Sequence, residues 1–151
     1  MISLVNVIKS FEGVNALDGV TLTVPKGKLQ GIVGPGGCGK STLCKVICGL
    51  LKPDLGVVFA AGADMAKSDD KKKSEIQARI GMQFQNDALF EHMSVRENIE
   101  YPLKRLTDLD ERETRSRSME FLAMVGLLGF EDSLPSKLSG GQRRRVALAQ
   151  S

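Results

Sequence analysis

The sequence predicts an α/β fold whose second half is helical, and three patterns indicate it. β-Branched alternation marks strands at the start of the chain, a glycine-rich loop separates an apolar run from an amphipathic segment, and capped helical periods dominate after residue 86. The 151 residues suit one ordinary domain, and a content of 42% apolar residues is enough for a packed core. The composition therefore argues against disorder.

The first 85 residues alternate between strand and helix patterns. The expected elements are strands at 1–9, 19–25, 29–33, 56–61 and 80–85 and helices at 41–51 and 68–78. The first two strands are expected to pair in antiparallel fashion across a turn-rich loop. Lys52 and Pro53 should end the first helix, and Ser68 is expected to cap the second.

Residues 86–137 have helical periodicity instead. Two capping-box pairs mark helix starts: Ser94 with Glu97, and Asp110 with Glu113. Pro102 should bend or end the first of these helices because proline lacks the amide hydrogen, and Gly126 is placed to close the second. The predicted organisation is a partial α/β core at 1–85, a helical subdomain at 86–137, and a final motif with the start of its helix at 138–151.

Charge and hydropathy exclude several classes of function. The 21 Lys and Arg residues against 18 Asp and Glu give a formal net charge of +3, so no strong field selects nucleic acid or anionic lipid as a partner. The longest uncharged apolar stretch, 121–130, is about half as long as a membrane-spanning helix. No basic segment followed by an apolar run opens the chain, so neither a targeting peptide nor a membrane span is expected.

The cysteines point to a reducing compartment rather than to a metal site. The chain has three, which leaves one unpaired and suits a cytosolic protein. Cys44 and Cys48 are one helical turn apart, but the only histidine, His92, is distant in the sequence, so four metal ligands are not readily gathered. Small buried thiols are the simpler interpretation.

Residues 34–41, Gly-Pro-Gly-Gly-Cys-Gly-Lys-Ser, match the phosphate-binding pattern G-x-x-x-x-G-K-[ST] between a predicted strand and a predicted helix. Glycines let such a loop turn its N–H groups onto an anion, and the helix N-terminus adds partial positive charge. Lys40 is expected to approach the β- and γ-phosphates, and the Ser41 hydroxyl is expected to ligate Mg²⁺. The alternative is a glycine-rich turn that happens to precede lysine.

This motif predicts a P-loop NTPase (RecA-like) core that binds ATP with Mg²⁺. The predicted nucleotide-binding residues in it are Gly34, Gly36, Gly37, Cys38, Gly39, Lys40, Ser41 and Thr42. Cys38 is also a candidate reactive thiol, because Lys40 and a helix N-terminus should favour its thiolate. The simpler interpretation of Cys38 is a small residue tolerated at a variable motif position.

A second anion site is predicted at Leu138-Ser139-Gly140-Gly141-Gln142. Ser139 is a good N-cap, and the two glycines would let a phosphate of another chain approach the helix N-terminus closely. Taken alone, the pentapeptide could be a loop leading into a helix, with the arginines at 143–145 as solvated surface.

Together with the phosphate loop about a hundred residues earlier, this segment resembles the ATP-binding cassette (ABC) transporter ATPases, whose signature is LSGGQ. The resemblance implies that Phe11 stacks on adenine, a contact typically worth about 1 to 3 kcal/mol; an ordinary core phenylalanine is the alternative. It also implies that Gln85 is a catalytic residue that contacts Mg²⁺ or the attacking water and senses the membrane partner.

The resemblance further implies a head-to-tail pair of ATPase subunits bound to membrane-spanning permease subunits at the inner face of the cell membrane. Each ATP would lie between the Lys40 loop of one subunit and the signature of the other, contacted there by Ser139, Gly140, Gly141 and Gln142. Binding would then favour closure of the pair, and hydrolysis would favour its separation.

Residues 88–103, which include ALFEHMSV and YPL, look most like ATPases of MCE-type lipid transport systems. Importers of polar solutes carry similar segments and remain the alternative, as do a non-catalytic nucleotide-binding fragment and a soluble ABC protein in translation or repair. His92 in this segment is expected to lie on an exposed coupling surface rather than to act as a catalyst.

Two further features depart from the family pattern: Gly36 stands where serine is frequent, and Gln150 where arginine is common. The apolar strand ending in Asp, the catalytic Glu and the switch His that follow the signature in the family are not within the 151 residues. The chain is therefore expected to be the N-terminal part of an ABC ATPase, truncated before the Walker B strand. Loss of a positioned base typically lowers the rate about 10²- to 10⁴-fold, so turnover by the 151 residues alone should be negligible.

Overall fold

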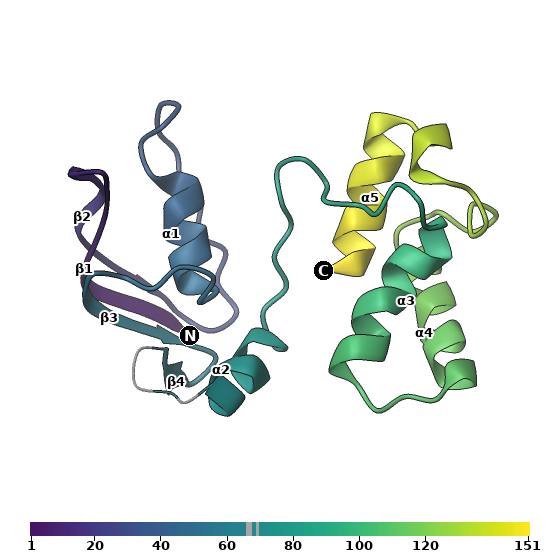
Figure 1. Ribbon diagram of the computed structural model, residues 1–151, viewed down its shortest axis with the longest axis horizontal. Coiled ribbons are helices and arrows are strands. Elements are labelled where there is room, and N and C mark those ends of the chain that lie inside the picture. Colours follow the sequence, from purple (N-terminus) through teal and green to yellow (C-terminus); the bar gives the residue numbers. More distant parts are fainter. Residues whose placement is uncertain (66–67, 69) are drawn as a thin grey trace. The chain divides into compact units, whose positions relative to one another are not determined.

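The computed structural model describes residues 1–65, 68 and 70–151. In chain order the elements are β1 (Ile2–Phe11), β2 (Val14–Val24), α1 (Lys40–Ile47), β3 (Leu55–Ala60), β4 (Ala63–Asp64), α2 (Asp70–Gln77), α3 (Val95–Leu106), α4 (Glu111–Met124), the 3-10 turn η1 (Pro135–Lys137) and α5 (Gly140–Gln150) (Figure 1). They form two compact units, Met1–Gly81 and Met82–Ser151. The predicted α/β fold with antiparallel strands first and helices after them is confirmed.

The first unit is built on a four-stranded antiparallel sheet of order β2-β1-β3-β4. Strands β1 and β2 form the expected hairpin, whose register runs from Ile2 opposite Val24 to Phe11 opposite Val14. The two-residue turn of Glu12 and Gly13 has φ values of 49° and 82°, which suit the twist of a tight hairpin. Because the turn is this short, β2 begins at Val14 rather than at residue 19 as predicted.

The core of the first unit lies between α1 and the sheet. Helix α1 buries Leu43 and Val46, which join Leu4, Val7 and Val58 of the strands in one apolar cluster. This burial fixes the axis of α1, and therefore the direction in which its N-terminus and the glycine loop point. Burying side chains of this size typically contributes about 1.5 to 3 kcal/mol each.

Two predicted strands, at 29–33 and 80–85, are wrong. Residues 28–35 have no regular structure, and the side chains of Leu29 and Val33 are 100% and 94% exposed. Residues 80–84 are likewise irregular, and Gln85 lies in a turn. An apolar run becomes a strand only when neighbouring strands take up its backbone hydrogen bonds. In the described part of the chain, all strand pairs are antiparallel and none includes either run.

The second unit packs α3, α4 and α5 around a separate core, which includes Val95, Ile99, Leu122, Leu127 and Val146. The signature helix α5 therefore shares its core with the helical segment before it. Within the ranges the structure describes, no helix is long and apolar enough to cross a membrane, and α4 is the longest with 14 residues.

The predicted helix starts in this unit are confirmed. Ser94 caps α3 and Asp110 caps α4, each in a reciprocal capping box with the acid three residues later. Gly126, with φ 66°, follows the C-cap of α4 as expected. Helix α3 continues through Pro102, so of the two predicted effects, a bend or an end, the end is wrong and the bend stays a prediction. The ring removes one donor, but burial of Val95 and Ile99 and the capping box hold the turns before it, and the Lys104–Glu100 ion pair spans it.

The predicted capping of α2 by Ser68 stays a prediction. The helix begins at Asp70, and the Ser68 hydroxyl donates to the Asp64 carbonyl at 2.7 Å. Residue 69, between them, lies outside the described residues. Serine hydroxyls in turns commonly make such local bonds to the backbone, which compete with capping.

The capping box of α3 predicts an acid-sensitive contribution to stability. The Glu97 carboxylate accepts from the Ser94 backbone N–H at 2.7 Å, and this bond holds the pKa of Glu97 below its usual 4.5. Because the folded-state pKa is lower than the unfolded one, the stabilisation is complete above about pH 4.5 and is lost as the pH falls through the folded-state pKa.

We therefore expect the midpoint of thermal unfolding to fall less steeply below pH 4.5 for Glu97→Gln than for the wild-type protein. The exposed Glu111 of α4 offers a matched control, and Glu111→Gln should follow the wild-type profile. Circular dichroism from pH 6 to 3 measures all three. Parallel profiles for Glu97→Gln and the wild type would contradict the assignment.

Candidate functional site

Helix α1 begins without a cap of its own. Its N-cap residue is Gly39, with φ 92°, which offers no side-chain acceptor, and the first turn contains no acidic residue. Helices α3, α4 and α5 differ, because each has a complete capping box. The first N–H groups of a helix have no intrahelical acceptor. The N-terminus of α1 therefore presents donors and partial positive charge to an acceptor from outside the chain.

The glycines of the loop differ in how strongly the backbone requires them. A Cβ on Gly39 would collide with the Ala16 carbonyl oxygen of β2, and one on Gly34 would lie 2.7 Å from the Cys38 Sγ. Gly37 has φ 78°, which side chains rarely adopt, whereas a Cβ on Gly36 would meet nothing within 4 Å. Positions 37 and 39 thus need glycine for their backbone, whereas a side chain at Gly34 would require the Cys38 side chain to move. Position 36 could hold serine, which agrees with the departure noted at Gly36.

Lys40 lies across the same loop. Its Nζ donates to the carbonyl oxygens of Gly34 and Pro35 at 2.8 and 2.7 Å and lies 3.5 Å from the Cys38 Sγ. A phosphate oxygen would be a stronger acceptor for the ammonium than these neutral carbonyls. Cys38 is exposed, but its predicted reactivity stays a prediction.

The donor set fits a nucleotide phosphate with a hard cation. Ser41 is exposed in the first turn of α1, and Thr42, next to it, is half-buried. A hydroxyl oxygen at this place suits Mg²⁺, which prefers oxygen ligands shared with phosphates. Gln85 is exposed in the second unit, and its predicted contacts with Mg²⁺ and water remain predictions.

Phe11 ends β1 opposite Val14, and its side chain is 45% exposed. It is not a core residue, so the alternative interpretation of this phenylalanine is wrong. The Lys9 Nζ lies 5.5 Å from the ring centroid, on the same strand. An exposed ring of this kind is available for stacking, and the predicted adenine contact stays a prediction.

The second predicted anion site begins α5. Ser139 is its N-cap, as predicted: its hydroxyl accepts from the Gln142 N–H at 3.3 Å, and the Gln142 side chain accepts from the Ser139 N–H at 2.8 Å. The N–H groups of Gly140 and Gly141 have no acceptor within the helix. A Cβ on either glycine would meet nothing within 4 Å, so nothing inside the chain requires glycine here.

Sequence reasoning missed the contacts that hold the loop before α3. Asn98 is fully buried; its Oδ1 accepts from the Phe90 N–H, and its Nδ2 donates to the carbonyls of Phe90, Met93 and Ser94. Arg143 forms ion pairs with Glu91 and Asp87, so it is not the solvated residue that the alternative assumed. The helical period marks position 98 as buried, but nothing local identifies its partners.

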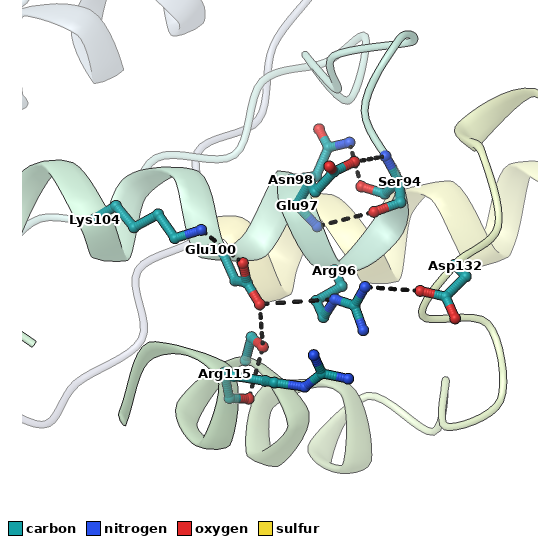
Figure 2. Close-up of polar contacts among 9 residues, drawn as sticks. Ser94, Arg96, Glu97, Asn98, Glu100, Lys104, Arg115 and Asp132 are labelled. Carbon is teal, nitrogen blue, oxygen red and sulfur yellow. Dashed lines mark hydrogen bonds and ion pairs between the residues drawn. The ribbon is translucent and has the colours of Figure 1, made fainter. Parts of the chain in front are cut away.

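A further polar network ties α3 to α4, as Figure 2 shows. The buried Glu100 accepts from the Lys104 ammonium at 2.9 Å and from the Ser118 hydroxyl of α4 at 3.5 Å. The Arg96 Nε lies 3.8 Å from the Glu100 Oε1, and the Arg96 Nη2 lies 2.9 Å from the Asp132 Oδ1. These contacts satisfy a buried carboxylate and fix the two helices against each other, a structural role.

The glycine loop and the uncapped helix with its lysine match the phosphate-binding pattern of P-loop nucleotide-binding domains. The family model described as "ABC transporter" matches residues 17–151, and the chain belongs to this family. The resemblance first noted at the LSGGQ segment is thereby confirmed.

Individual relatives give the same family with several cargoes. The chain is 43% identical over 149 residues to the Fe(3+) ions import ATP-binding protein FbpC of Escherichia coli (strain K12), covering 99% of this chain and 41% of that protein. It is 43% identical over 147 residues to the chloroplastic protein TRIGALACTOSYLDIACYLGLYCEROL 3 of Arabidopsis thaliana, covering 97% and 42%. The chain thus spans about two-fifths of the length of these curated relatives.

Among solved structures, the dimeric structure of MJ0796, a bacterial ABC transporter cassette, superposes with a TM-score of 0.90. It is 36% identical to this chain, and the match covers 99% of this chain and 68% of that one. The ABC ATPase cassette fold is therefore established for the 151 residues.

Proposed function

We propose that this chain supplies the ATP-binding half-sites of an ABC ATPase that hydrolyses ATP to drive transport across a membrane. The observation that carries the proposal is the N-terminus of α1, which has no cap and no acid and is joined to the Lys40 ammonium by a glycine loop. Such an N-terminus is stabilised by an external polyanion. In this proposal the phosphates of Mg²⁺–ATP bind residues 34–42, and Phe11 stacks on the adenine.

The proposed chemistry assigns a role to each predicted site residue. Lys40 and the loop N–H groups hold the β- and γ-phosphates, the Ser41 hydroxyl holds Mg²⁺, and Gln85 orients the attacking water or contacts the metal. Bound Mg²⁺ would neutralise charge that develops on the phosphates. Hydrolysis is proposed for the intact protein, as the family membership suggests.

The proposed active form is a head-to-tail dimer. The free N–H groups of Gly140 and Gly141, together with the Ser139 hydroxyl, would bind the ATP held by the other subunit. The open space around both glycines supports this arrangement, because another molecule can approach there closely. Permease subunits in the membrane would hold the dimer at the cytoplasmic face and receive its motion.

Two cargo classes are supported by similarity. The relative named as an Fe(3+) importer favours a small polar solute. The relative whose name contains a galactolipid, together with the segment 88–103, favours lipid transport as a second candidate. ATP hydrolysis by the complex with its own permease distinguishes the two: stimulation by phospholipid vesicles indicates a lipid, and stimulation by a solute indicates an importer.

Ser139→Ala tests the dimer. We expect the Kd of the Ser139→Ala monomer for ATP to stay within about twofold of the wild-type value. The dissociation constant of the dimer in magnesium-free ATP should rise at least about tenfold, since a hydrogen bond to a charged group contributes about 1.5 to 3 kcal/mol. Analytical ultracentrifugation and equilibrium dialysis on the intact protein measure the two quantities.

Ser94→Ala is the matched control, because it removes the same hydroxyl from the capping box of another helix in the same unit. Both variants should lose about 1 kcal/mol of stability with their caps. Only Ser139→Ala should lose dimerisation. Equal loss of monomer affinity from Ser139→Ala and Lys40→Ala would show that the cross-subunit assignment is wrong.

A further inference from the structure

Arg143 joins two parts of the second unit that are far apart in the sequence. It lies in the first turn of α5, one residue after Gln142, and its side chain is 24% exposed. Its Nη2 and Nη1 contact the two carboxylate oxygens of Glu91 at 2.5 and 3.3 Å, and its Nε lies 3.7 Å from the Asp87 Oδ2. One guanidinium thus binds two acids that lie more than 50 residues earlier in the chain.

These acids belong to the segment that follows the predicted catalytic glutamine, residues 85–91, here called the Gln85 segment. Two successive non-glycine residues in it, Asp87 and Ala88, have left-handed backbones with φ 59° and 55°. Such conformations persist where the surroundings hold them, and they concentrate at functional sites. Arg143 holds one of the two residues directly through the Asp87 carboxylate.

The far end of the segment is also fixed. Asn98, fully buried, bonds both backbone groups of Phe90, so the chain cannot slide past α3 there. Two kinds of contact join the segment to α5: Leu89 packs in the apolar cluster that includes Val146 of α5, and the guanidinium of Arg143 contacts the carboxylates of Glu91 and Asp87. The neighbouring Arg144 and Arg145 are exposed, and neither side chain has an ion pair in the described part of the chain.

We propose that Arg143 is a positioning residue that couples the Gln85 segment to the first turn of α5, so that binding at the helix N-terminus changes the segment. The inference rests on the proposed function, because the ligand at that N-terminus is the ATP of the other subunit. A fork of two parallel hydrogen bonds resists rotation as well as separation, which suits transmission of a small displacement.

The charges of the pair are stable over the range in which the protein would work. The hydrogen bond from Arg143 lowers the pKa of Glu91 below its usual value, and the bond to Glu91 raises the pKa of the guanidinium. The link is therefore not a pH switch near neutrality. It is expected to respond to displacement alone.

Hydrogen–deuterium exchange on the intact ATPase tests the coupling. Magnesium-free ATP drives the dimer, and the readout is the change in exchange of the Asp87 and Ala88 amides between monomer and dimer. In the wild-type protein we expect slowing of at least about fivefold, the lower end of typical allosteric coupling. In Arg143→Ala, compared at an equal fraction of dimer, the slowing should fall below about twofold.

Three companion variants separate coupling from stability. Glu91→Ala removes the Arg143–Glu91 ion pair by deleting its acid, which is the more exposed partner. It should lose the slowing of amide exchange, as Arg143→Ala should. Arg143→Lys keeps the cation but not the fork, so its response should lie between those of the wild type and Arg143→Ala. Arg144→Ala removes an arginine from the next position of the same helix and should behave as the wild type.

The outcomes distinguish the coupling from the proposed function. The coupling alone is overturned if the wild-type dimer forms but exchange of the Asp87 and Ala88 amides does not slow. It is also overturned if exchange of these amides slows in the Arg143→Ala dimer as much as in the wild type. Absence of any ATP-driven dimer in the wild-type protein overturns the proposed function and the coupling with it.

Discussion

Lys40→Ala is expected to raise the Kd of the intact protein for Mg²⁺–ATP at least about 100-fold. At about 4 Å and an effective dielectric near 20, a unit-charge pair contributes about 4 kcal/mol, which corresponds to nearly three powers of ten. Part of this is offset, because the ammonium must leave the carbonyls of Gly34 and Pro35, which it contacts at 2.8 and 2.7 Å. Equilibrium dialysis with labelled ATP measures the change.

Lys45→Ala is the control for this variant. It removes the same charge from the exposed last turn of α1, at the opposite end of the helix from the glycine loop. A cation at that end interacts with the helix dipole but not with a phosphate bound at the loop. The Kd of Lys45→Ala for ATP should stay within about twofold of the wild type. Binding by Lys40→Ala within about tenfold of the wild type would mean that the lysine is not the main phosphate contact.

The features that the sequence predicted correctly are those whose chemistry is local. A capping box needs only two side chains three positions apart, so Ser94, Asp110 and Ser139 could each be placed at a helix start from the sequence. The glycine loop before α1 is similarly local, since its glycines and Lys40 occupy eight consecutive positions, and its binding of phosphate stays a prediction. The antiparallel pairing of β1 and β2 was predicted from alternation, whereas the loop expected between them is a two-residue turn.

The features that could not be predicted depend on distant partners. The runs at 29–33 and 80–85 have the composition of strands, but a strand also needs neighbours, and its own residues do not reveal whether these are present. Arg143 was missed for a related reason, because its partners Asp87 and Glu91 lie far from it in the sequence. Asn98 was missed although its acceptors are carbonyls of the loop just before it, because that loop has no regular spacing from which to predict them.

Gly39→Ala is expected to abolish measurable ATP binding and to destabilise the protein by about 2 to 5 kcal/mol. The methyl group would collide with the Ala16 carbonyl oxygen, a backbone atom of β2 that cannot turn away as a side chain could. The φ of 92° adds the cost of a left-handed backbone, about 1 to 2 kcal/mol, to an overpacking cost of about 1 to 3 kcal/mol. To relieve the collision or the backbone strain, the loop has to move away from the start of α1. The N–H groups that would bind the phosphates then no longer lie together.

Two neighbouring glycines separate the contributions of backbone strain and collision. At Gly37, φ is 78° but a Cβ would meet nothing within 4 Å, so Gly37→Ala should show the strain alone. At Gly36 neither applies, and Gly36→Ala should bind ATP within about threefold of the wild type. The unfolding midpoint should fall, and the Kd for ATP should rise, least in Gly36→Ala, more in Gly37→Ala and most in Gly39→Ala. If Gly39→Ala retained wild-type affinity, the close approach of β2 could not be what shapes the phosphate loop.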